Sequence, residues 1–165
     1  MFRLLVFALA LWALHARAEI PEEYQPIIIK PPFSFSERLI DLSVAVEKAN
    51  SDNKALYIYL GAEDCPPCRT YKNFLFENRS ALKEAFDNVI LVDIRTWLKG
   101  PTLIFKVGEK KYSFAEFNAL VGDNNKSLSY PYFWFISPTL KQLNLFSSVE
   151  PVKTAANSML ERDNG

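Results

Sequence analysis

The stretch that decides the fold of this chain is YIYLGAEDCPPC, residues 57–68. A β-prone apolar run from Ala55 to Leu60 predicts a short buried strand. Cys65 and Cys68 follow, separated by two prolines, which fit the first turn of a helix because backbone N–H groups there have no helical partner. The stretch therefore predicts a strand that leads directly into a helix, with Cys65 at the helix N-terminus.

The predicted position of the cysteines has a chemical consequence. Unpaired N–H groups and the helix dipole at a helix N-terminus favour a thiolate, and the thiolate is the nucleophile in disulfide exchange. Cys68 falls one helical turn later, where we expect it to be shielded. We therefore predict that Cys65 is the exposed nucleophile and that Cys68 is the resolving thiol.

Two other roles for the cysteine pair are a structural disulfide and a metal site. A structural disulfide is the usual fate of two cysteines in an exported chain, but a bridge closing so short a loop removes little chain entropy. A metal site needs about four ligands, and this sequence offers two thiols and one histidine, His15. We expect no metal and no cofactor, and a non-catalytic binding module in which Cys65 and Cys68 form a static disulfide stays open as the alternative.

The N-terminus has the pattern of a cleaved signal peptide. Arg3 is followed by an apolar run of 11 residues, Leu4 to Leu14, and by the small residues of Ala16-Arg17-Ala18. A helix of that run spans only about 16 Å, against roughly 30 Å for the hydrocarbon core of a bilayer. We therefore expect residues 1–18 to be removed and the protein to be periplasmic or secreted, with no membrane span left. His15 leaves with this segment, which excludes Cys–His chemistry.

Composition limits the remaining classes. The 165 residues, of which 49% are hydrophobic, suit one domain with a real core. Charges balance at 19 basic and 19 acidic without a basic run, so nothing favours a nucleic-acid partner. Four prolines mark residues 19–33 as an extended arm, and residues 34–165 would form the domain. We expect a monomer, because no dimerisation segment is evident.

The rest of the chain alternates helical and strand patterns. Ser34 and Glu37 form a capping-box pattern that predicts a helix to about Asn50, and Ser113 and Glu116 repeat the pattern before a short helix. Strands are predicted over residues 89–94, 102–107 and 132–136, then a hairpin strand at 143–146 and a final helix at 152–162.

This order of elements resembles the thioredoxin superfamily over roughly residues 35–163. The resemblance implies an α/β thioredoxin fold: a central mixed sheet flanked by helices, here with an insertion before the strand that follows the family's cis-proline. It also implies a thiol–disulfide oxidoreductase acting on protein thiols or disulfides, together with an upstream redox partner. The resemblance leaves the direction of electron transfer open.

The cis-proline of the family faces the cysteines across the site, and two prolines are candidates for it. Pro101 leaves only six residues after the strand ending at Ile94, whereas a parallel crossover needs about a dozen or more. We therefore expect Pro131 to be the cis-proline. The resemblance further implies that Tyr130, Pro66 and Pro67 contact the substrate.

The sequence also departs from thioredoxin itself. The buried acid that thioredoxin carries six residues before the first cysteine is replaced by Tyr59, and the tryptophans near the site by Gly61 and Asp64. Glu63 and Asp64 either take the acid's role as proton acceptor for Cys68 or are solvated loop charges.

Overall fold

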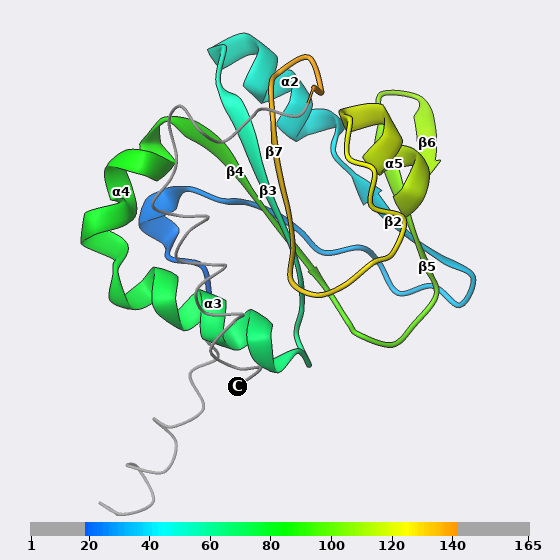
Figure 1. Cartoon of the computed structure of the whole chain (residues 1–165), viewed down its shortest axis with the longest axis horizontal. Coiled ribbons are helices and arrows are strands. Elements are labelled where there is room, and N and C mark those ends of the chain that lie inside the picture. The colour runs from blue at the N-terminus through cyan, green and yellow to red at the C-terminus, as the bar shows by residue number, and fades with distance from the viewer. Residues whose placement is uncertain (1–18, 142–165) are drawn as a thin grey trace, which may run out of the picture.

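A four-stranded mixed sheet forms the centre of the molecule (Figure 1). The computed structural model describes residues 19–141. The strands lie in the order β1-β4-β3-β7, and only β7 is antiparallel to its neighbour. Their bounds are Ile27–Ile29 for β1, Ala55–Ala62 for β3, Val89–Thr96 for β4 and Tyr132–Ile136 for β7. The order confirms the α/β class and the mixed sheet expected for the fold.

Helices cover both faces of this sheet, and the alternation along β3 shows how. Leu56, Ile58 and Leu60 point into a cluster shared with the helices α2 and α5, whereas Tyr57 and Tyr59 point into a second cluster shared with α3 and α4. In Figure 1 these two pairs of helices lie on opposite sides of the sheet. The helices run over Ser43–Asp52 (α2), Pro66–Glu77 (α3), Arg79–Asp87 (α4) and Phe114–Val121 (α5).

The predicted insertion forms a smaller second sheet. Strands β5 (Thr102–Val107) and β6 (Lys110–Ser113) make a hairpin, and β2 (Glu37–Asp41) pairs in parallel with β5. The predicted capping box is present at the start of α5: the Ser113 hydroxyl accepts from the Glu116 N–H, and the Glu116 carboxylate accepts from the Ser113 N–H. This helix then leads the chain toward β7.

The helix predicted from Ser34 to Asn50 is wrong in its first half. The Ser34 hydroxyl does accept from the Glu37 N–H at 3.4 Å, but the turn leads into β2 rather than a helix. Arg38 and Ile40 are buried in alternation with less buried neighbours, which suits a strand beside β5. The helix begins only at Ser43, whose N–H donates to Asp41. Tertiary pairing with the insertion therefore overrides a local capping pattern.

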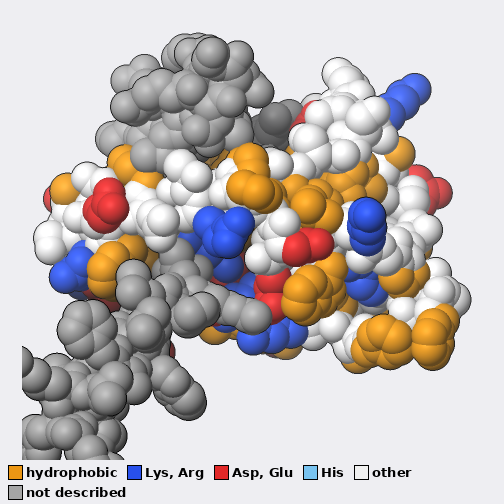
Figure 2. Space-filling model, turned by 90° about the horizontal axis from the view of Figure 1, so that it is seen from below, with side chains coloured by type: hydrophobic (Ala, Val, Ile, Leu, Met, Phe, Trp, Pro, Cys, Tyr) orange, Lys and Arg blue, Asp and Glu red, His pale blue; other side chains and the backbone are white. Residues whose placement is uncertain are grey.

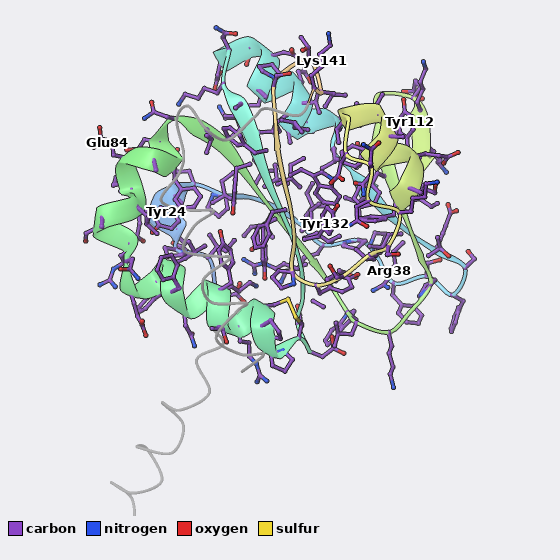
Figure 3. The ribbon with its side chains drawn as sticks, viewed as in Figure 1. Tyr24, Arg38, Glu84, Tyr112, Tyr132 and Lys141 are labelled. Carbon is purple, nitrogen blue, oxygen red and sulfur yellow. A yellow bond between two sulfur atoms is a disulfide. The ribbon has the colours of Figure 1, made fainter. Side chains whose placement is uncertain are left out.

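The prediction of an unpacked arm over residues 19–33 is also wrong. A 3-10 helix, Glu22–Tyr24, packs on the domain, and β1 extends the main sheet beside β4. Ile20 and Tyr24 are buried at 2% and 4% exposure, and the Tyr24 hydroxyl donates to the Leu75 carbonyl at 3.0 Å. Figure 3 shows Tyr24 pointing in among the helices α3 and α4. The prolines shape this segment without keeping it away from the core.

The hairpin strand and the final helix predicted after residue 142 lie outside the described residues. Between residues 19 and 141, no helix combines the length and the hydropathy that crossing a bilayer requires.

Candidate active site

Cys65 and Cys68 form a disulfide where β3 ends and α3 begins. Their Cα atoms lie 5.2 Å apart. Cys65 is the N-cap residue of α3 with an extended backbone, and its sulfur accepts a hydrogen bond from the Cys68 N–H at 3.2 Å. Pro66 and Pro67 occupy the first two helical positions, as the sequence predicts. Figure 3 shows the disulfide as the yellow bond at the start of α3.

The expected difference in exposure between the two cysteines is absent from this oxidised state. Both are 1% exposed, so Cys65 is not the exposed residue that the sequence predicts. The reason is that the disulfide belongs to the second hydrophobic cluster, together with Tyr59, Tyr71 and Ile20. What distinguishes the cysteines is their position: only Cys65 caps the helix.

The peptide bond between Tyr130 and Pro131 is cis, as expected. The argument from a parallel crossover is wrong, however, because β7 runs antiparallel to β3. β7 pairs with β3 so that Tyr132 lies opposite Leu60, and Tyr130 packs against the hydrophobic cluster that contains both cysteines. The rejected candidate, Pro101, instead leads into the second sheet, and no cis bond is present there among residues 19–141.

Tyr130 is half-buried and packs against both hydrophobic clusters. Burial raises the pKa of its phenol, and a hydrogen bond with Thr96 opposes that shift. Pro66 is exposed, Pro67 is half-buried and Pro131 is buried. The residues expected to contact a substrate therefore surround the disulfide with different degrees of exposure.

Comparison with known families agrees with this geometry. A family model described as thioredoxin-like matches residues 37–138, more than half of the chain. The chain belongs to this thioredoxin-like family. No curated protein and no solved structure matches it. A thioredoxin-like domain with a cysteine pair at disulfide distance supports a redox function in general.

This thioredoxin-like domain has a buried acid on β4, a strand for which the sequence predicted no functional residue. Asp93 on β4 is fully buried and lies directly beside Tyr59 in the register of β3 and β4. Its Oδ2 accepts from Arg95 Nε at 2.6 Å, while its Oδ1 and the Tyr59 hydroxyl have no hydrogen-bond partner within the described structure. An aspartate within the apolar run of Val89 to Ile94 is the sequence signal that could have revealed it.

A small cavity lies between Cys68 and Arg95, the residue that pairs with Asp93. It has a volume of about 40 Å³, and its wall includes Cys68, Lys72, Arg95 and Glu19. Arg95 also forms an ion pair with Glu19, so one guanidinium binds both the buried acid and the N-terminal segment. Lys72 lies one turn after Cys68, is only 9% exposed and holds its ammonium 5.8 Å from the centre of the Tyr59 ring. Cys68 therefore faces a small cavity whose wall includes charged side chains, at the edge of an otherwise apolar cluster.

Glu63 and Asp64 have structural positions that the sequence did not anticipate. The Glu63 N–H donates to the Thr96 carbonyl at 2.9 Å, and Glu63 also lines the cavity. Asp64 is exposed, but its carboxylate accepts from the Leu98 N–H at 2.8 Å. Asp64 is thus a cap for the loop after β4. No group of side chains suited to a metal ion is present within residues 19–141.

Burial raises the pKa of Asp93 above 3.8, against the opposing effects of Lys72 and Arg95. An acid whose folded pKa is raised stabilises the fold below its unfolded pKa and loses that contribution as pH rises through the folded pKa. Asp93→Asn imitates the neutral acid. We therefore predict that the free energy of unfolding of the variant, relative to the wild type, increases as pH rises from about 4 to 7.

Chemical denaturation of both proteins across this range measures the effect. Asp52→Asn is a suitable control, because Asp52 is a surface carboxylate paired with Lys48 whose folded pKa is lowered, so its difference should change in the opposite direction. If the difference in free energy of unfolding between Asp93→Asn and the wild type stays constant or falls as pH rises, the raised pKa of Asp93 is contradicted.

Proposed function

We propose that the protein is a thiol–disulfide oxidoreductase that exchanges electrons with protein cysteines through Cys65 and Cys68. The observation that carries the proposal is the position of Cys65 as the N-cap of α3, where its sulfur accepts the Cys68 N–H. In the reduced state, the same N–H and the helix dipole stabilise a thiolate on that sulfur.

The exchange proceeds in two substitutions that balance. The Cys65 thiolate attacks one sulfur of the partner's disulfide, forming a mixed disulfide and releasing the partner's other sulfur as a thiolate. The Cys68 thiolate then attacks Cys65, which forms the intramolecular disulfide and releases the second partner sulfur. Two electrons pass from the cysteine pair to the partner, and the reverse steps oxidise a partner dithiol. The partner's reduction potential sets the direction.

The second substitution requires Cys68 to lose its proton inside the cluster. We propose that this proton leaves through the cavity beside Cys68. Asp93 does not line that cavity, and it acts on the site only through its ion pair with Arg95 on the cavity wall. Lys72, on the cavity wall, would stabilise the resulting Cys68 thiolate.

Residues around the disulfide would contact the substrate. Pro66 is exposed at the start of α3, and Pro67 and Tyr130 are half-buried. Pro131 is buried in the turn that brings β7 alongside β3, and we propose that it fixes this wall of the site.

A static disulfide is the second candidate, and the burial of both cysteines favours it. A buried sulfur pair is hard for a partner to attack, and such a bridge would simply join the end of β3 to α3. The short loop that it closes argues against a structural role, because little chain entropy is removed.

Trapping separates the two candidates. In the exchange mechanism, Cys68→Ser leaves Cys65 without its resolving thiol, so a reduced variant should accumulate a mixed disulfide with a disulfide-bonded protein. The matched control Cys65→Ser should accumulate at least about tenfold less, because Cys68 lacks the helix-capping position. Non-reducing gel electrophoresis detects the adduct, and alkylation near neutral pH should label Cys65 faster than Cys68. Equal trapping by both variants, or by neither, favours the static disulfide.

We further propose that the protein acts on exported proteins in the periplasm or outside the cell. The support is the pattern of residues 1–18: a basic residue, a short apolar run and small residues at 16 and 18. N-terminal sequencing of protein recovered outside the cytoplasm tests this, with Glu19 as the expected first residue. Recovery only from the cytoplasm with Met1 intact would contradict it.

A further inference from the structure

Three hydrogen-bonded side chains join the second sheet to the residue before the cis-proline. Arg38 lies on β2, Thr96 is the last residue of β4, and Tyr130 precedes Pro131. The Arg38 guanidinium donates to the Thr96 hydroxyl, and that hydroxyl is hydrogen-bonded to the Tyr130 phenol. We call these three residues the Arg38 triad. The two substitutions of the exchange reaction give no role to Arg38 or Thr96.

Arg38 is held in place by the loop that follows β4. It is 7% exposed, and besides Thr96 its guanidinium binds the Trp97 carbonyl at 3.1 Å and the Pro101 carbonyl at 3.1 and 3.2 Å. A Cβ at Gly100, whose φ is 147°, would lie 3.0 Å from this guanidinium, so the loop closes tightly around it. All of these hydrogen bonds end on uncharged oxygen atoms, which do not neutralise the positive charge. Figure 3 shows Arg38 where β2 and β5 begin.

Thr96 contacts both the cysteine turn and Tyr130. It pairs with Ala62, the last residue of β3, and its carbonyl accepts from the Glu63 N–H at 2.9 Å. Thr96 is 1% exposed, so its hydroxyl binds only the groups packed around it. Arginine donates hydrogen bonds and never accepts them, so the Thr96 oxygen accepts from Arg38 and the hydroxyl hydrogen remains to be donated.

The Tyr130 phenol receives this hydrogen. Burial raises the pKa of the phenol, and so does the Asp64 carboxylate, whereas the hydrogen bond with Thr96 and the charge of Arg38 lower it. A hydrogen bond that favours the phenolate is one in which the phenol oxygen accepts. The O–H of Tyr130 is then left to donate, and hydrogen bonds in such a series strengthen one another. The triad is therefore polarised from Arg38 toward Tyr130.

A bound polypeptide can accept the hydrogen bond that Tyr130 has left to donate. Tyr130 is half-buried and packs against the hydrophobic cluster that contains both cysteines. Oxygen accepts hydrogen bonds better than sulfur, and the oxygen atoms next to any cysteine of a polypeptide are those of its backbone carbonyl groups. Figure 2 views the molecule from the end where α3 begins and shows charged and hydrophobic groups side by side on that face. A polypeptide bound there meets polar as well as apolar contacts.

We propose that Arg38 is a positioning residue of the redox site: acting through the Thr96 hydroxyl, it fixes the Tyr130 phenol as a hydrogen-bond donor to a backbone carbonyl of the polypeptide partner. The second sheet thereby takes part in the reaction, because it supplies Arg38. The inference rests on the proposed function, since it assumes that the partner forms a mixed disulfide with Cys65.

A peptide with one cysteine, linked to glutathione as a mixed disulfide, tests the phenol. The reduced protein attacks this disulfide and ends with its own disulfide, and the released peptide thiol and glutathione are quantified with time. Tyr130→Phe should slow this reaction about tenfold, the factor that one hydrogen bond usually supplies. Reduction of the oxidised protein by dithiothreitol, which has no carbonyl group, should stay within about twofold of the wild-type rate, because no hydrogen bond is lost there.

Thr96→Val tests the triad at nearly constant shape, because it replaces one hydroxyl by a methyl group. Exchange with the peptide should slow at least about threefold, since the phenol loses the hydrogen bond that orients it. The double variant Thr96→Val/Tyr130→Phe should be within about twofold of Tyr130→Phe, because the hydroxyl acts only through the phenol. Titration of the Tyr130 ring by NMR should give a higher pKa in Thr96→Val than in the wild type, since a bond that lowers this pKa is lost.

Arg38→Met tests the source of the polarisation. It should slow peptide exchange at least about as much as Thr96→Val and raise the pKa of the Tyr130 phenol, because it removes a charge and a donor. Arg38→Lys keeps the charge, so the phenol pKa should lie between those of the wild type and Arg38→Met. If Arg38→Met does not fold, as chemical denaturation would reveal, Arg38→Lys and Thr96→Val decide the question.

Tyr132→Phe is the matched control. Tyr132 lies two residues further along, and its phenol donates to Asp123 at 2.6 Å, outside the triad, so its loss should leave peptide exchange unchanged. A wild-type rate for Tyr130→Phe with the peptide would overturn the inference and leave the oxidoreductase intact. The inference would also fail if Thr96→Val slowed exchange equally with and without the Tyr130 hydroxyl, or if these variants slowed dithiothreitol as much as the peptide. No exchange by the wild type with either substrate would refute the proposed function itself.

Discussion

The structure depends on one junction, where β3 ends and α3 begins at Cys65. Parallel pairing with β4 fixes the direction of β3. The N-terminus of α3, with its unpaired N–H groups, therefore lies just beyond the C-terminal end of β3. Cys65 caps the helix through its sulfur, so one atom serves both the local fold and the redox chemistry. The prolines that follow lock the first helical turn without removing a hydrogen bond that a helix would use.

Two arginines bind residues next to this junction: Arg38, which is buried, and Arg95, whose side chain is 9% exposed. Arg95 forms ion pairs with Asp93 and with Glu19. Asp93 is the only buried acid within the described residues, and Arg95 neutralises it. The pair with Glu19 holds the N-terminal segment at the cavity beside Cys68. Removing this arginine alone would leave a buried carboxylate unpaired, at a cost of about 3–5 kcal/mol. Arg38 has a different role, because it fixes the loop that carries Trp97 beside the site. Arg95 therefore pairs with the buried acid and lines the cavity at Cys68, whereas Arg38 fixes the loop that carries Trp97.

Local sequence patterns predicted the elements whose structure is set by interactions between residues close together in the chain. The strand before Cys65, the helix after it and the capping box of α5 all follow from composition and spacing. The cis bond at Pro131 was expected from the family resemblance, and the parallel crossover used to choose this proline is not present, because β7 is antiparallel. The β2 strand could not be recognised, because its partner β5 is more than sixty residues away and a serine turn imitated a helix start.

The burial of Cys65 and the role of Asp93 share a similar explanation. Each depends on side chains from several elements that meet only in the folded chain, and the N-terminal segment is one of them. Proline content indicated that this segment was extended, but not that Ile20 would pack in the cluster of the cysteines. An aspartate within an apolar strand was the single clue to the buried charge, and only the pairing of β3 with β4 shows that it lies beside Tyr59.

The central claim is that the cysteine pair cycles between thiols and a disulfide. Its reduction potential, obtained by equilibrating the protein with glutathione or dithiothreitol buffers and quenching with acid, tests this most directly. The helix-capped thiolate stabilises the reduced state, so the account predicts a potential within the range of about −270 to −120 mV that redox-active pairs occupy. A potential below about −300 mV, typical of structural disulfides, would contradict it.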